Sequence, residues 1–161
     1  MDRPIYHQGR QVGTLRAVPD GLYWQLTAFC EPFSGGVQRL YGAEDLRTEP
    51  FGVFVPDGKG LHLHRRLSRH GCPDLPELWL AGRETDGWRP WRGTVEGQSV
   101  PDAMLRGQGE GCELALPAEG EGLPLAEYVP QMRPLTLEGR EYLVLPIPNG
   151  VPEAAPEAPE P

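Results

Sequence analysis

Residues 11–30, QVGTLRAVPDGLYWQLTAFC, place a Pro-Asp-Gly turn between two apolar segments. We predict strands over 11–18 and 22–30, because Pro fixes one backbone dihedral of such a turn and Gly accepts a positive φ. Alternate side chains of a strand point to opposite faces. The cleaner apolar set of the second strand is predicted to face inward and contains Leu22, Trp24, Leu26, Ala28 and Cys30.

Residues 51–67, FGVFVPDGKGLHLHRRL, repeat this pattern around a second Pro-Asp-Gly turn. Leu61, Leu63 and Leu67 share the predicted inner face, which Arg65 interrupts. A third hairpin is expected where 135–137 and 142–145 flank Glu138-Gly139, and a short strand is expected over 38–41. Residues 101–106 and 124–128 are candidates for single helical turns, since Pro is tolerated at a helix start.

These signals predict an all-β fold, an antiparallel β-sandwich or a partly open barrel of short strands with at most one or two short helical turns. One β-rich domain is expected over 1–147. The hairpins near 11–30 and 51–67 are either a degenerate repeat or two copies of a common turn. Residues 148–161 repeat Pro, Glu and Ala and predict a disordered tail, because they offer little surface to bury.

Composition limits the partners of the chain. Residues 1–109 contain equal numbers of basic and acidic side chains, so the net charge of −8 comes from residues 110–161. An acidic C-terminal third argues against nucleic acid, which requires a basic face. No apolar segment is long enough for a membrane helix, and the N-terminus lacks the pattern of a secretory signal. We therefore expect a soluble, cytoplasmic protein, and the excess of Arg over Lys is typical of GC-rich bacterial genomes.

One cluster has the residue types of a metal site. His62 and His64 would point the same way on a strand, and a chain reversal after Leu67 would bring His70 and Cys72 to them. A site that mixes imidazole and thiolate ligands in this way favours zinc or a similar borderline metal. Neighbouring arginines oppose a dication, and the simpler interpretation makes His62 and His64 the solvent face of a strand.

Two further groups are candidates for binding. Around the histidines, Arg65, Arg66 and Arg69 form a basic patch with Lys59, which suits an acidic ligand. The second group lies where Pro and Gly predict a loop, and it contains Trp88, Arg89, Trp91 and Arg92. Exposed indoles would form a platform for a sugar or a protein, whereas buried indoles would cap the end of the sandwich with their N–H groups bonded to backbone.

No phosphate-binding glycine loop, nucleophile elbow or metalloprotease helix occurs in the sequence. The favoured interpretation is therefore a non-enzymatic module that binds an unknown protein or acidic ligand and needs no cofactor. The alternative is a metal-dependent enzyme with zinc at the His/Cys cluster. A third hypothesis is a carbohydrate-binding module that uses the loop tryptophans.

Overall fold

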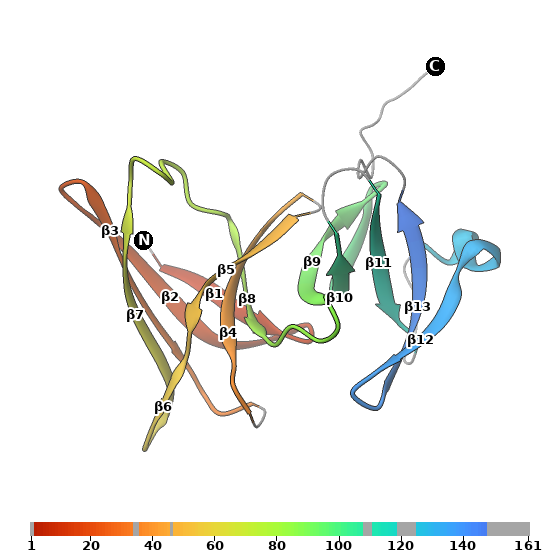
Figure 1. The fold of residues 1–161 in the computed structure, drawn as a ribbon, viewed down its shortest axis with the longest axis horizontal. Coiled ribbons are helices and arrows are strands. Elements are labelled where there is room, and N and C mark those ends of the chain that lie inside the picture. The colour runs from red at the N-terminus through yellow and green to blue at the C-terminus, as the bar shows by residue number, and fades with distance from the viewer. Residues whose placement is uncertain (1, 34–35, 46, 108–110, 119–124, 148–161) are drawn as a thin grey trace. The chain divides into compact units, whose positions relative to one another are not determined.

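The computed structural model describes residues 2–33, 36–45, 47–107, 111–118 and 125–147 (Figure 1). In this part of the chain there are thirteen strands and one short 3₁₀ turn, which confirms the all-β prediction. None of its helical segments is long and apolar enough to cross a membrane. The tail predicted over 148–161 lies outside the described residues.

The chain contacts group into two compact units. The first unit comprises Met1–Glu44 and Glu49–Arg83, and the second comprises Asp45–Thr48 and Glu84–Pro161. Such units are either parts of one domain or two domains, so the single domain over 1–147 stays a prediction.

The first unit is built on an eight-stranded sheet with the order β5-β4-β8-β1-β2-β3-β7-β6. Its strands are β1 Asp2–His7, β2 Arg10–Asp20, β3 Tyr23–Cys30, β4 Arg39–Glu44, β5 Arg47–Val53, β6 Val55–Asp57, β7 Gly60–Ser68 and β8 Leu78–Gly82. The pairings among β1, β2, β3, β7 and β6 and between β4 and β8 are antiparallel, whereas β1 and β8 are parallel.

The two edge strands of this sheet, β5 and β6, follow each other in the chain with Phe54 alone between them. Opposite edges of the sheet are therefore held one residue apart, which a flat sheet cannot satisfy. The backbone N–H of Phe54 donates to the Gln38 carbonyl at 2.9 Å. From β7, Arg65 Nη1 donates to the Phe51 carbonyl on β5 at 2.7 Å. The sheet thus curls into the nearly closed, barrel-like form that was predicted.

The inner face of β3 is largely the predicted one, since Leu26, Ala28 and Cys30 are buried. Leu22 was assigned to that face wrongly, and it is 78% exposed. Pro19 pairs with Trp24 and Asp20 with Tyr23, so the turn is Gly21-Leu22 and Leu22 lies at the tip of the hairpin. Gly21 has a φ of 62°, which suits the first position of a type II′ turn. Trp24 is half-buried against the core.

The inner face of β7 also follows the prediction. Leu63 is buried, and Leu61 and Leu67 are half-buried against the same core. Arg65 lies on this side of the strand, where a leucine would extend the core. The Arg65 guanidinium donates a hydrogen bond to the Phe51 carbonyl, which belongs to the edge strand β5. This explains why a polar residue interrupts the row of leucines on β7.

The two Pro-Asp-Gly hairpins share a register. Asp57 pairs with Gly60, so Gly58 and Lys59 form a two-residue loop like that of the first hairpin. In each hairpin the Asp side chain bonds the residue five positions later, which is Gln25 in the first and His62 in the second. A tight hairpin turn alone can produce this likeness, so the repeat stays a prediction.

The second unit contains a five-stranded antiparallel sheet with the order β12-β13-β11-β10-β9. Its strands are β9 Arg89–Val95, β10 Gln98–Arg106, β11 Cys112–Pro117, β12 Arg133–Leu137 and β13 Arg140–Ile147. Trp88 packs in a cluster with Ala115, Leu137, Tyr142 and Val144. The predicted hairpin at Glu138-Gly139 is confirmed, with φ values of 50° and 79° that suit a type I′ turn.

Of the two predicted helical turns, one is wrong and one is close. Residues 101–106 belong to β10, where the pairing register shifts between Val100 and Ala103. Pro101 falls in this bulge, where its missing N–H does not break the ladder, so the same residue suits a strand as well as a helix start. The other turn is the 3₁₀ segment Ala126–Gln131.

The core of the first unit makes a direct test possible. Leu26 is fully buried on β3, whereas its neighbour Thr27 is exposed on the other face. Leu26→Ala should lower the free energy of unfolding by about 2–5 kcal/mol, because it removes packed methyl groups and leaves a cavity. Thr27→Ala should change it by about 0.5 kcal/mol or less. Urea denaturation measures both, and equal effects would contradict the face assignment.

Candidate functional site

Most of the predicted binding residues of β7 lie on the outward side of the first unit, which we call the outer face. It consists of the outward side chains of four adjacent strands, Thr14, Arg16 and Val18 on β2, Tyr23, Gln25, Thr27 and Phe29 on β3, His62, His64 and Arg66 on β7, and Val55 on β6. The register sets them in rows across the strands. One row runs Thr14, Phe29, His62, Val55, the next Arg16, Thr27, His64, and the third Val18, Gln25, Arg66.

Several large apolar side chains of the outer face are exposed to solvent. Val55 is 54% exposed, Phe29 46% and Val18 43%. Phe29 and Val55 flank His62 on neighbouring strands, so apolar surface is gathered at this end of the face. Phe29 also covers Gly60, where a Cβ would lie 3.0 Å from the ring.

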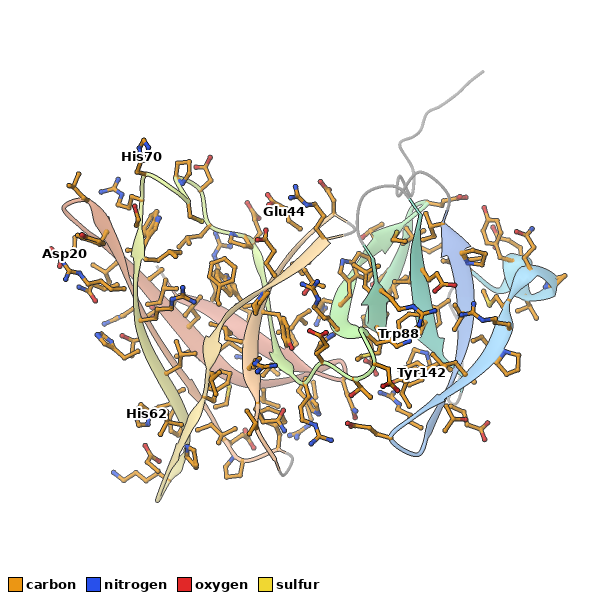
Figure 2. The ribbon with its side chains drawn as sticks, viewed as in Figure 1. Asp20, Glu44, His62, His70, Trp88 and Tyr142 are labelled. Atoms are coloured by element: carbon orange, nitrogen blue, oxygen red, sulfur yellow. The ribbon has the colours of Figure 1, made fainter. Side chains whose placement is uncertain are left out.

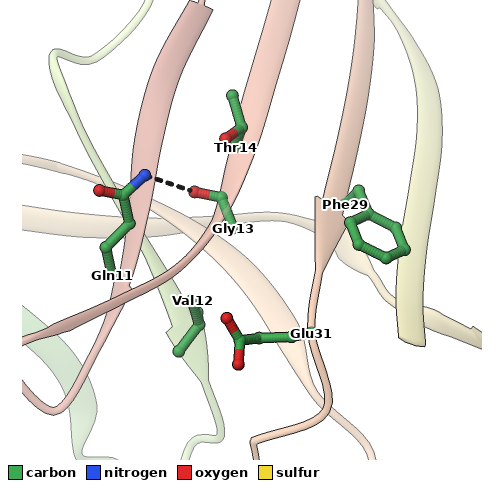
Figure 3. A pocket seen from close by; sticks show the side chains of 6 residues that line it. All are labelled: Gln11, Val12, Gly13, Thr14, Phe29 and Glu31. Carbon is green, nitrogen blue, oxygen red and sulfur yellow. Dashed lines mark hydrogen bonds between the residues drawn. The ribbon is translucent and has the colours of Figure 1, made fainter. Parts of the chain in front are cut away.

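A shallow depression of about 400 Å³ lies beside Phe29, at one end of the outer face (Figure 3). It is lined by Gln11, Val12, Gly13, Thr14, Phe29 and Glu31. Gly13 is required here, because a Cβ would lie 2.0 Å from the Phe29 carbonyl oxygen. The register of β1 and β2 shifts at this point, so the depression lies next to a bulge.

The histidines of β7 are bonded to their own neighbours on the outer face. His62 Nδ1 lies 2.9 Å from Asp57 Oδ2, and His64 Nδ1 lies 3.3 Å from Thr27 Oγ1. Asp57 also accepts from the backbone N–H groups of Lys59 and Gly60. The Lys59 N–H, followed by the bonds from Gly60 and His62, holds the pKa of Asp57 below its usual range.

The structure does not bring together the four residues of the predicted zinc site. Figure 2 shows His62 and His70 at opposite ends of β7. Cys72 lies beyond the strand, and its Sγ is 3.4 Å from the Asp74 carbonyl. Among the described residues, no group of three or more His, Cys, Asp or Glu side chains has the arrangement of a metal site. His62 and His64 instead match the simpler interpretation, the exposed face of a strand.

Arg66 and Arg69 each stack on an aromatic ring from the start of β3. The guanidinium carbon of Arg66 lies 3.9 Å from the centre of the Tyr23 ring, and that of Arg69 lies 5.3 Å from Trp24. Arg69 Nη1 donates to the Gly21 carbonyl at 2.9 Å. A second depression, of about 360 Å³, is lined there by Gly21, Leu22, Arg69, His70 and Pro73.

The tryptophan group is a strand rather than the predicted loop, since Arg89–Val95 forms β9. The alternation of apolar and polar side chains along this strand is hard to recognise in the sequence, because Pro90 and Gly93 interrupt it. Trp88 is 1% exposed and Trp91 is 2% exposed, so the interpretation as an exposed platform is wrong. Trp91 Nε1 donates to the Asp45 carbonyl at 2.6 Å, as the interpretation with buried indoles predicted.

The remaining arginines of this group lie on the same strand. Arg89 Nη1 donates to the Thr48 carbonyl. Arg92 is half-buried beside Trp91, and the Trp91 ring lies over Gly93, where a Cβ would be 2.6 Å from it. Arg89 also lies 3.9 Å from Glu84 Oε1, so its charge is partly engaged within the second unit.

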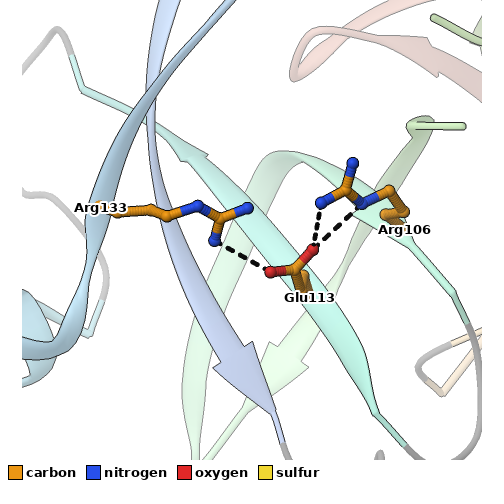
Figure 4. A network of polar contacts seen from close by, with 3 residues as sticks. All are labelled: Arg106, Glu113 and Arg133. Carbon is orange, nitrogen blue, oxygen red and sulfur yellow. Dashed lines mark hydrogen bonds and ion pairs between the residues drawn. The ribbon is translucent and has the colours of Figure 1, made fainter. Parts of the chain in front are cut away.

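An ion network in the second unit was missed by the sequence reasoning (Figure 4). Arg106 donates to Glu113 Oε1 from Nε at 3.0 Å and from Nη2 at 2.6 Å, and Arg133 Nη1 donates to Oε2 at 2.9 Å. Burial raises the pKa of Glu113, but the bonds from the two arginines outweigh it, so the pKa lies below the usual range. Arg106 and Glu113 are seven residues apart and face each other in the pairing of β10 with β11, whereas Arg133 on β12 is twenty residues from Glu113.

Comparison of the sequence with models of known protein families gives no match, and comparisons with curated proteins and with solved structures give none either.

The three thiols should differ in reactivity. Cys30 and Cys112 are buried, and Cys72 is half-buried. Burial raises the pKa of all three, that of Cys30 to about 12. With Ellman's reagent at neutral pH, Cys72 should react first, because access to thiolate controls the rate. Cys30 and Cys112 should react only on unfolding, and Cys72→Ser should remove the early phase. Early modification of Cys30 would contradict the packing of the barrel.

The Glu113 network should make the protein sensitive to acid. A folded-state pKa below the unfolded value of about 4.3 gives stability that is fully present above that pH and is lost as the pH falls through the folded pKa. Glu113→Gln should cost about 1 kcal/mol at neutral pH and much less in acid. Glu141→Gln, at an exposed position of β13, is the matched control. Denaturation at several pH values measures this, and a constant difference would contradict the role of the carboxylate.

Proposed function

We propose that the protein is a non-enzymatic binding module that docks a segment of another protein on its outer face. The observation that carries this proposal is the row of Phe29, His62 and Val55, with Val18 exposed in the third row of the same face. Single exposed apolar residues are ordinary on any surface. Exposed apolar residues that lie side by side on adjacent strands are less common, because the solvent side of an antiparallel sheet is normally polar.

The form of the face favours a protein over a small molecule. Ligand pockets enclose most of their ligand and aim a few polar groups at it. The depression beside Phe29 is instead open, and the Gln11 amide bonds the Gly13 carbonyl at 3.4 Å within it. A surface that extends across four strands suits the larger, flatter contact of a protein partner.

The other two functions have less support. A metal-dependent enzyme needs ligands that converge, and the described residues offer no such group. A carbohydrate module of the predicted kind needs exposed indoles, and Trp88 and Trp91 are buried. The binding proposal uses side chains that are exposed and lie next to one another.

Site-specific crosslinking tests the proposal. A photoreactive amino acid placed at Phe29 or at Val55 should crosslink the same discrete protein in cells that make this chain. The same group at Val129, which is 41% exposed on the 3₁₀ segment of the second unit, should not. Thr27→Arg, at the centre of the face, should remove the crosslinks while the melting temperature stays unchanged. Equal products from Val129 and Phe29, or no discrete product, would overturn the proposal.

A further inference from the structure

Four arginines of the described chain stack on aromatic rings, two in each unit. In the second unit, Arg106 lies 4.7 Å from the centre of Trp88, and Arg140 lies 5.5 Å from Tyr142. In the first unit the pairs are Arg66 with Tyr23 and Arg69 with Trp24. A stacked guanidinium keeps its N–H donors in the plane of the group, so its rim can still bind an anion.

Both stacked arginines of the second unit hold a carboxylate of the chain itself. Arg106 donates to Glu113 at 2.6 Å, and Arg140 Nη2 donates to Asp102 at 2.7 Å. Charge-assisted hydrogen bonds of this type are about twice as strong as neutral ones. The second unit thus contains two completed examples of one arrangement, an arginine over an aromatic ring with a carboxylate bonded to its guanidinium.

The stacked arginines of the first unit have no such carboxylate among the described residues. Arg69 uses one N–H on the Gly21 carbonyl, and the contact of Arg66 is the Tyr23 ring. The acids near the outer face bond other groups. Asp2 pairs with Arg16 at 3.1 Å, Asp20 accepts from Gln25, and Asp57 bonds His62.

We infer that Arg66 on the outer face, and Arg69 just past the end of β7 at the β2–β3 turn, bind carboxylates of an acidic segment of the protein that docks on the outer face and extends past this end of it. This inference rests on the proposed function and adds the chemistry of the partner. Arg66 lies in the row of Val18 and Gln25, so an acidic side chain bound there has exposed apolar surface beside it. The segment therefore combines Asp or Glu with apolar residues.

The arrangement favours carboxylates over phosphate. A phosphate group carries up to two charges and is usually held by several converging donors. Arg66 and Arg69 instead stack on separate rings, and each completed pair in the second unit brings a carboxylate to its own stacked arginine. One carboxylate for each stacked arginine is the pattern in the second unit, where Glu113 also accepts from Arg133.

Fluorescence anisotropy with the purified full chain tests this inference. The probe is a short fluorescein-labelled peptide of alternating Glu and Thr with one central Leu, and the comparison peptide has Gln in place of Glu. At low salt the Glu peptide should bind at least about tenfold more tightly than the Gln peptide, and salt should weaken it. Arg66→Gln and Arg69→Gln should each weaken binding about tenfold. Arg16→Gln should change it less than about twofold, because Arg16 already has Asp2.

Three outcomes would overturn the inference. Equal binding of the Glu and Gln peptides would exclude an acidic segment, and crosslinking from Phe29 would then still support the outer face. Tighter binding of a phosphoserine version would assign the arginines to phosphate. A labelled peptide of residues 148–161 that binds at least as tightly as the Glu peptide would point to this chain's own sequence in place of a partner. Melting temperatures of the three variants near that of the parent exclude unfolding as the cause.

Discussion

The covalent link through Phe54 is the constraint on which the first unit depends. Because β5 and β6 are the two edges of one sheet and are a single residue apart, the sheet has to curl until its edges approach. Curling divides the side chains of every strand into an apolar interior and an outward set. The outward residues of β2, β3, β7 and β6 then form one continuous face. Arg65 belongs to this closure, since its bond to Phe51 completes an edge that strand pairing leaves open.

Arginine lies over an aromatic ring in both units, but the surroundings of the arginine differ between them. Where the register brings a carboxylate to the stacked arginine, as with Arg106 and Glu113, the result is an internal contact that contributes to stability. Where it does not, as with Arg66 on Tyr23, the cation lies on the exposed side of its strand. The difference depends on strand register rather than on the kind of residue.

Local signals in the sequence were sufficient for much of the fold. Alternation and turn residues predicted the hairpins, because both act over a few neighbouring positions. Leu22 was misplaced because a shift in the turn moves a residue from the face to the tip. Pro101 and the Trp88–Gly93 segment were misread because Pro and Gly suit bulges and edge strands as well as helix starts and loops. The stacking of Arg66 on Tyr23 could not be predicted, since it needs the register of β3 against β7.

The four residues of the zinc hypothesis are not gathered in the described part of the chain, for a related reason. Spacing along β7 allowed His62 and His64 to share a ligand, but the path of the chain after Ser68 decides whether Cys72 returns to them, and it does not. The β7 strand instead exposes cationic side chains such as Arg66 to solvent. Replacing such a side chain with a neutral one leaves no buried charge without a partner. Exposed cations of this kind contribute little to folding. A change at Arg66 should therefore cost little stability, whereas a change at Glu113 or Arg65 removes hydrogen bonds that hold strands together.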